Sequence, residues 1–119
     1  MSDIRMGPAE TQFAEIIWAS EPIASGELSR KAEETLRWKK TTSFTVLKRL
    51  CERGIFQNQK GIVTSLISRD EFFARHSEQY VQETFGGSLP AFMAAFSTRR
   101  KLTDKEIDEM KDLIEKMRG

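Results

Sequence analysis

Basic and hydroxyl side chains with a clear chemical use gather in one central segment of the chain. Between Arg37 and Lys60 there are seven basic residues and one acid, Glu52, for a net charge of +6, although the whole chain carries only +1. Ammonium, guanidinium and hydroxyl groups bind phosphate oxygens and base edges, so the segment is typical of a surface that contacts nucleic acid. The alternative interpretation is a solvated charged face whose hydroxyls only cap a helix.

Other kinds of chemistry have few candidates. Cys51 is the only cysteine and His76 the only histidine, and they lie far apart in the sequence. A disulfide framework needs cysteine pairs, and a zinc site needs several thiolate or imidazole ligands. We find no Gly-rich phosphate loop, nucleophile elbow or His-x-x-x-His helix, and the acids are spaced as surface charges are. The sequence therefore predicts no catalytic site, no metal and no cofactor.

Hydrophobic spacing predicts the elements that carry the basic segment. Apolar residues recur at helical intervals in three stretches, and Pro22 and Gly54 stand where two of the helices end. Two short apolar runs then flank a polar tip that carries Lys60, which predicts a β-hairpin. This order is that of a winged helix, whose second and third helices form a helix-turn-helix. The predicted elements are a helix that starts at Pro8, is closed by Trp18 and ends before Glu21-Pro22, a short strand at 23–24, helices over 25–34 and 41–53, and a hairpin with strands at 55–56 and 62–63.

The densest part of the basic segment opens the second helix of the predicted helix-turn-helix. In such motifs this helix enters the major groove of DNA and its first residues reach the base edges. Lysines there suit phosphates or guanine, hydroxyls suit phosphates or bases, and the methyl group of Thr45 suits thymine. Phe44 stands on the same polar side and either contacts DNA or packs inward. The predicted DNA-binding residues are Lys39, Lys40, Thr41, Thr42, Ser43, Thr45, Lys48, Arg49 and Lys60.

The remainder of the chain predicts three helices that have little to pack on within one chain. They cover 69–85, 89–96 and a last stretch that begins at Thr103, where Glu106 completes the spacing of a capping box. Exposing their aromatic and methionine side chains would be costly, which favours an intermolecular core and hence a homodimer. The alternative is that these helices fold back over the first half. The candidate dimerisation residues are Phe72, Phe85, Phe92, Met93, Phe96, Met110 and Leu113.

The predicted fold is therefore mainly α with a small β-hairpin: a winged helix-turn-helix followed by a C-terminal helical dimerisation region. We place the DNA-binding domain at 1–68 and the helical dimerisation domain at 69–119. No stretch approaches the roughly 20 apolar residues of a membrane helix, and residues 1–7 lack the apolar run of a secretory signal. We expect a cytoplasmic protein without membrane insertion.

The order of these features resembles the penicillinase repressor (BlaI/MecI/CopY) family of bacterial transcriptional regulators, over nearly the whole chain. The resemblance implies a homodimeric repressor bound to a dyad-symmetric operator, in which the winged helix reads DNA and the C-terminal helices dimerise. The residues that carry it are Ala9-Glu10, Ile16-Ile17-Trp18, Ile23, Glu27, Thr42, Thr45, Leu47, Arg49-Leu50, Arg53-Gly54, Gly87, Leu89, Phe96, Leu102-Thr103 and Ile107.

The sequence departs from the family pattern in four places. Some members are inactivated by proteolysis of an Asn-Phe bond, triggered by a membrane sensor for β-lactams, but the matching pair here is Ala95-Phe96. Other members release DNA when copper binds a C-terminal cysteine cluster, which this chain lacks because its only cysteine is Cys51. Ser43 stands where the family usually has an apolar residue, and Ile62 where the wing usually has an arginine. We therefore do not expect release by a sensor-linked protease or by copper.

These observations predict a sequence-specific DNA-binding transcriptional repressor that acts as a homodimer on a dyad-symmetric operator. The alternative is a winged-helix module that binds another protein and not DNA. The two differ in one property, because only the first requires a salt-dependent affinity for DNA.

Overall fold

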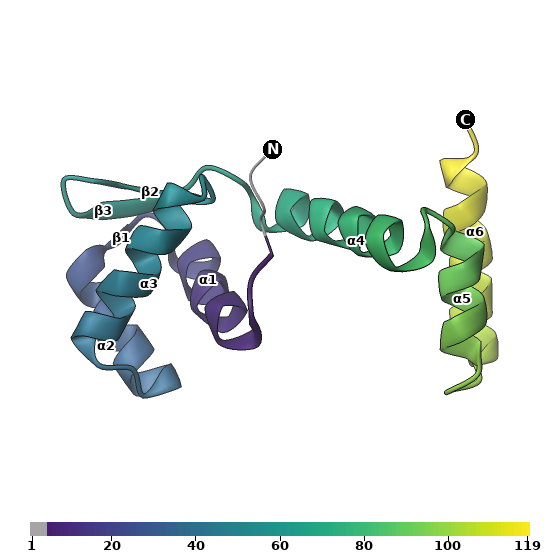
Figure 1. Ribbon diagram of the computed structural model, residues 1–119, viewed down its shortest axis with the longest axis horizontal. Helices are drawn as coiled ribbons and strands as arrows, with labels where there is room; N and C mark the ends of the chain where they lie inside the picture. Colours follow the sequence, from purple (N-terminus) through teal and green to yellow (C-terminus); the bar gives the residue numbers. More distant parts are fainter. Residues whose placement is uncertain (1–4) are drawn as a thin grey trace. The chain divides into compact units, whose positions relative to one another are not determined.

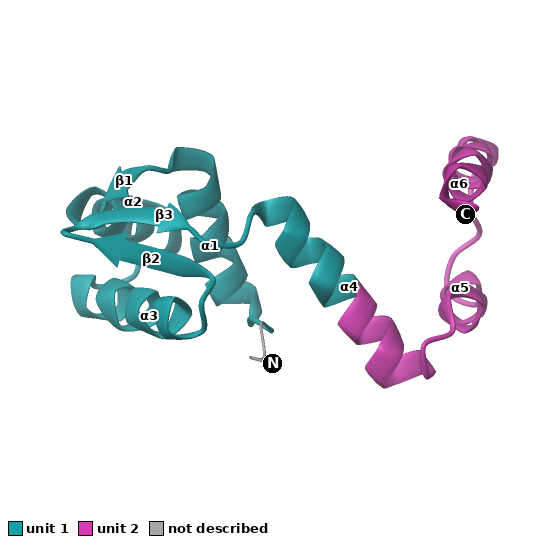
Figure 2. Cartoon of the chain, turned by 90° about the horizontal axis from the view of Figure 1, so that it is seen from above, with its two compact units in different colours: residues 1–77 teal, residues 78–119 magenta. Residues whose placement is uncertain are grey.

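The computed structural model describes residues 5–119, which form six α-helices and a three-stranded antiparallel sheet (Figure 1). The predicted fold class is confirmed, and the chain forms two compact units, residues 1–77 and 78–119, whose boundary falls inside α4 (Figure 2). The elements are α1 (Pro8–Ser20), β1 (Ile23–Ala24), α2 (Ser25–Leu36), α3 (Lys40–Glu52), β2 (Phe56–Gln59), β3 (Ile62–Ser65), α4 (Arg69–Phe85), α5 (Leu89–Ser97) and α6 (Asp104–Met117).

The first unit is held together by apolar side chains from α1, α2, α3, the sheet and the start of α4. Each helix buries one stripe and exposes the other, as its 3.6-residue spacing predicts. Full burial of a large apolar side chain contributes about 1.5–3 kcal/mol relative to leaving it in water. The core consists of Phe13, Ala14, Ile17, Ile23, Leu28, Ala32, Val46, Leu47, Leu50, Ile55, Phe56, Val63 and Phe72.

The sheet has the order β1-β3-β2 because the two residues of β1 pair with β3. Ile23 lies opposite Val63 in this pairing, and both side chains are buried. The hairpin turns through Lys60 and Gly61, whose φ angles of 53° and 85° are both positive, as a type I′ turn requires. Glycine adopts this conformation freely, whereas Lys60 does so at a cost of about 1 kcal/mol. The turn leaves Lys60 exposed at the tip of the wing.

An aromatic cluster ties the first turn of α4 to the winged helix. The ring of Trp18 lies 5.4 Å from that of Phe56 and 5.5 Å from that of Phe72. Its indole Nε1 donates a hydrogen bond to the carbonyl oxygen of Ile67 at 3.0 Å, which fixes the chain just before α4. Phe72 is 1% exposed, so it belongs to the core of the first unit. The structure thereby corrects the assignment of Phe72 as a dimerisation residue.

In the second unit, aromatic rings pack edge to face, and side chains cap the first turns of α5 and α6. The ring of Phe92 lies 5.6 Å from that of Phe85 and 6.2 Å from that of Tyr80, with the planes nearly perpendicular. The predicted capping box of α6 is present: the Thr103 hydroxyl accepts from the Glu106 N–H, and the Glu106 carboxylate accepts from the Thr103 N–H.

Across the described residues, every helix falls short of the length and apolar character that a membrane crossing requires.

The same capping box predicts an acid-sensitive start of α6. Hydrogen bonds from the Arg100 guanidinium, and then from the backbone of Thr103, lower the pKa of Glu106 from 4.5 to about 2. Because the folded pKa is the lower one, the cap stabilises α6 above about pH 4.5 and loses this effect as the pH falls towards 2. An NMR titration should give a carboxyl midpoint near 2, and Glu106→Gln should remove that titration. A midpoint near 4.5 would contradict the cap.

Candidate nucleic-acid interface

One face of α3 is buried and the opposite face is exposed. The buried residues are Ser43, Val46, Leu47 and Leu50. The exposed residues are Lys40, Thr41, Thr42, Phe44, Thr45, Lys48, Arg49 and Glu52. We call this second group the outer face of α3. It carries six of the nine residues predicted to bind DNA, namely Lys40, Thr41, Thr42, Thr45, Lys48 and Arg49, together with Phe44 and one acid, Glu52.

 Of the other three predicted DNA-binding residues, Lys39 is the exposed residue directly before α3, Lys60 is on the wing, and Ser43 is buried.

The two ends of α3 are fixed by different devices. At its C-terminal end, Gly54 has a φ of 80°, and its N–H donates to the carbonyl of Cys51 at 3.0 Å. The N–H of Ile55 donates to the carbonyl of Leu50 at 3.1 Å, which completes the Schellman arrangement that the position of Gly54 predicts. Both Ile55 and Leu50 are buried, so the end of α3 is locked to the core.

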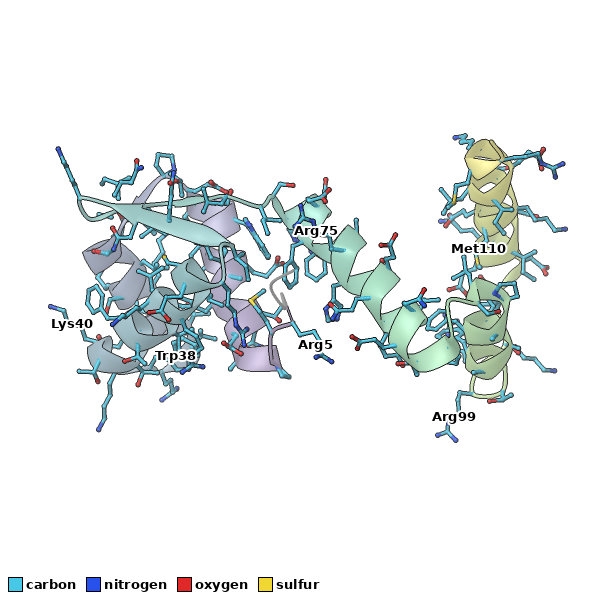
Figure 3. The ribbon with its side chains drawn as sticks, turned by 45° about the horizontal axis from the view of Figure 1, so that its top comes forward. Arg5, Trp38, Lys40, Arg75, Arg99 and Met110 are labelled. Carbon is cyan, nitrogen blue, oxygen red and sulfur yellow. The ribbon has the colours of Figure 1, made fainter. Side chains whose placement is uncertain are left out.

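Trp38 holds the start of α3, and the sequence analysis did not identify it. Its ring stacks on that of Phe13 with centroids 5.1 Å apart, in the connection between α2 and α3. In Figure 3, Trp38 lies against the helices while Lys40 extends away from the ribbon. The available signal was a large aromatic residue in an otherwise polar connection, because such a residue is rarely left in solvent.

Ser43 points inward, which corrects its assignment to the DNA-binding surface. The residue is 2% exposed, and its hydroxyl has no hydrogen-bond partner among the described residues. Val46 and Leu47 follow it by three and four positions in the helix, so it shares their buried face. The resemblance already placed Ser43 where the family usually has an apolar side chain, which was the signal for a core position.

Thr45 offers a narrower chemistry than its residue type suggests. Its hydroxyl donates a hydrogen bond to the carbonyl oxygen of Thr41 at 2.8 Å, one helical turn earlier. The hydroxyl hydrogen is therefore used within α3, and the methyl group and the oxygen lone pairs are left for a partner. Thr45 thus suits a base amino group or a thymine methyl group better than a phosphate oxygen.

Arg49 is paired with an acid of α1 at the edge of the outer face. Its Nη1 lies 3.5 Å from Glu10 Oε2, and the Arg49 side chain is half-exposed. Glu10 also accepts a hydrogen bond from the N–H of Gly7 through Oε1 at 3.2 Å, so it is held in place. A surface ion pair contributes at most about 1 kcal/mol, so Arg49 can leave Glu10 for a phosphate.

The lone cysteine is shielded on α3. Cys51 is half-buried, and burial first, then the charge of Glu52, raises the pKa of its thiol. The thiol therefore stays protonated at neutral pH, which makes it a weak nucleophile and a weak metal ligand. Within residues 5–119 no three histidine, cysteine or acidic side chains gather in a way that could hold a metal ion.

The remaining candidate dimerisation residues all lie in the second unit, which includes the end of α4. Phe96 and Leu113 are 37% and 58% exposed. Phe85, Phe92, Met93 and Met110 are half-buried, and Figure 3 labels Met110 on α6. Neither α5 nor α6 has a buried residue within this chain.

The chain matches the family model described as "Penicillinase repressor" over residues 6–116. It belongs to the penicillinase repressor family. Among curated proteins, it is 23% identical to a penicillinase repressor of Bacillus licheniformis over an aligned length of 115 residues, with 93% of this chain and 90% of that protein covered. It is 21% identical to a penicillinase repressor of Staphylococcus aureus over an aligned length of 115 residues, with 93% of this chain and 91% of that protein covered.

A third relative extends the same relationship. The chain is 20% identical to the methicillin resistance regulatory protein MecI of Staphylococcus epidermidis over an aligned length of 112 residues, with 91% of each chain covered. The penicillinase repressor family consists of DNA-binding transcriptional repressors with a winged-helix fold and not of enzymes. The predicted family, and the non-enzymatic class that the sequence indicates, are confirmed.

Proposed function

We propose that this penicillinase repressor family protein represses transcription as a homodimer, with α3 of each protomer in the major groove of a dyad-symmetric operator. The observation that carries the proposal is the division of α3 into a buried face and an exposed face of hydroxyl and basic side chains. A helix that is anchored at both ends and polar on its outer side is suited to enter a groove as a rigid body.

The outer face of α3 carries long basic side chains suited to phosphates and short threonine side chains suited to base edges. Lys40, Lys48 and Arg49 are exposed and long enough to pair with phosphates, which positions the helix without reading sequence. Thr42 and Thr45 are short and exposed, so they contact base edges only when α3 lies deep in the groove. Lys60 adds a phosphate contact from the tip of the wing.

The homodimer part of the proposal rests on α6. Leu113, Ile114 and Met117 are 58%, 58% and 68% exposed and lie on one side of the helix. A second copy of the chain would cover this stripe, and its twofold symmetry would match two half-sites about 10 bp, or a multiple of one helical turn, apart. Release by cleavage at Ala95-Phe96 is not part of the proposal, because this pair differs from the Asn-Phe bond of the sensor-linked members.

The proposal predicts how single substitutions change the salt dependence of DNA binding. Lys40→Ala and Arg49→Ala should weaken binding to every duplex and reduce the slope of log affinity against log salt. The expected reduction is about one unit per lost phosphate contact, hence about two for a homodimer. A fluorescence-anisotropy titration at several salt concentrations measures this slope. The probes are a duplex from the DNA upstream of the protein's own gene and a scrambled duplex.

Two comparisons make this experiment decisive. Arg75→Ala removes a cation of α4 that pairs with Glu71 at 2.8 Å, and it should leave the slope unchanged. Thr42→Ala and Thr45→Ala should change the preference between duplexes and leave the slope nearly unchanged. Unchanged binding in all four variants of α3 would refute its assignment as the reading helix. An unaltered protein that binds neither duplex at low salt would favour the protein-interaction alternative.

A further inference from the structure

Phe44 is an aromatic side chain on the otherwise polar outer face of α3. It is 36% exposed, one helical turn before Lys48 and one residue before Thr45. It belongs neither to the buried core nor to the partly buried apolar side chains that pack against the core. Packing of the winged helix therefore does not account for an aromatic ring at this position.

The ring of Phe44 borders a hollow between α3 and the wing. The hollow has a volume of about 290 Å³, and its walls are mainly apolar. Its lining residues are Phe44, Leu47, Lys48, Cys51 and Asn58. An apolar surface thus lies directly beside the part of α3 that is proposed to enter the major groove.

Cations stand next to this apolar surface. The Nζ of Lys40 lies 5.8 Å from the centre of the Phe44 ring, and Lys48 lines the hollow itself. The charge favours a polyanion as the occupant, whereas an apolar peptide would have to cover both ammonium groups. Among the groups at the major-groove edges of the four bases, the thymine methyl group is the apolar one.

We propose that Phe44 determines operator specificity by packing against a thymine methyl group in each half-site, while Lys40 and Lys48 hold the neighbouring phosphates. This inference rests on the proposed function and adds a residue that reads sequence by apolar contact. Burial of one methyl group stabilises a complex by about 0.8 kcal/mol, which is about fourfold in affinity and about sixteenfold for two half-sites.

The test uses deoxyuridine, which differs from thymidine only by the missing methyl group. The protein first selects its preferred duplex from a randomised pool, and each thymine of that duplex is then replaced in turn at symmetric positions. The unaltered protein should bind about sixteenfold more weakly when one particular symmetric pair is replaced. Phe44→Ala should bind the selected duplex, with all its thymines in place, more weakly than the unaltered protein does, by a similar factor. Its affinity should not change when that symmetric pair is replaced by deoxyuridine.

Matched variants separate apolar reading from a general loss of binding. Phe44→Leu should keep part of the methyl sensitivity, and Leu66→Ala, which shortens another exposed apolar side chain of the first unit, should keep all of it. The thermal midpoints of these variants should match that of the unaltered protein.

Three outcomes would overturn the inference: a selected duplex without thymine in its half-sites, no methyl-sensitive position, or a Phe44→Ala protein that keeps the full sensitivity. In each of these cases salt-dependent binding to the selected duplex would persist, so the proposed function would stand. Failure to bind any duplex would overturn both.

Discussion

Leu113→Glu should convert the proposed homodimer into a monomer that sediments with the mass of a single chain. Leu113 is 58% exposed in one chain, so a charge there costs the isolated chain little. In a dimer the same side chain would be covered, and an unpaired buried carboxylate costs several kcal/mol. Because a symmetric interface contains the change twice, we expect the dissociation constant to rise by more than about 100-fold.

Operator binding should fall with the loss of the dimer. Two linked α3 helices gain roughly 10²- to 10⁴-fold over one, because the second contact is made within the same complex. Lys116→Gln changes the charge of α6 by the same amount and should leave sedimentation unchanged. If Leu113→Glu still sedimented as a dimer at micromolar concentration, the α6 stripe would not be the interface.

Phe72→Ala should destabilise the first unit by about 3–5 kcal/mol, the usual cost of deleting a buried aromatic side chain. Phe72 is 1% exposed and packs against the rings of Trp18 and Phe73, at 5.5 and 5.3 Å. Domains are stable by about 5–15 kcal/mol, so this loss is a large share of the total. Urea unfolding should show the midpoint moving to a lower urea concentration. Tryptophan fluorescence is a suitable readout, because Trp18 lies beside the space that the deleted Phe72 ring would leave.

The same variant tests whether Phe72 belongs to the core or to a dimer interface. A core residue gives a loss that does not depend on protein concentration, whereas an interface residue gives one that does. Tyr80→Ala is the comparison, because Tyr80 is on the same helix but is 47% exposed and belongs to the second unit. If Phe72→Ala lowered the stability only slightly, and by an amount that depended on protein concentration, Phe72 would be a residue of the dimer interface and not of the core.

The elements of this protein could be predicted from the sequence because their signals are local. The spacing from Thr103 to Glu106 predicts a capping box, and Gly54 predicts the end of α3, since both depend on hydrogen bonds between residues a few positions apart. The hairpin around Lys60 and Gly61 follows in the same way from short apolar runs on either side of a turn.

The direction in which particular side chains point was decided by the tertiary structure. Ser43 belongs to a run of hydroxyl residues and looks equivalent to Thr42, yet a rotation of about 100° along α3 places it in the core. Phe72 and Phe92 are both phenylalanines. Phe72 packs against Trp18 and shares the core with Phe56, both more than ten residues away in sequence, whereas Phe92 does not.

The sequence by itself therefore determined the family, the order of elements and the concentration of positive charge in the central segment 37–60. Only the tertiary structure decided which hydroxyls reach solvent, that Trp38 anchors the start of α3 on Phe13, and that Glu10 of α1 pairs with Arg49. The physical reason is that burial and pairing depend on neighbours brought together by folding, whereas helix formation, capping and turns depend on residues close in the chain.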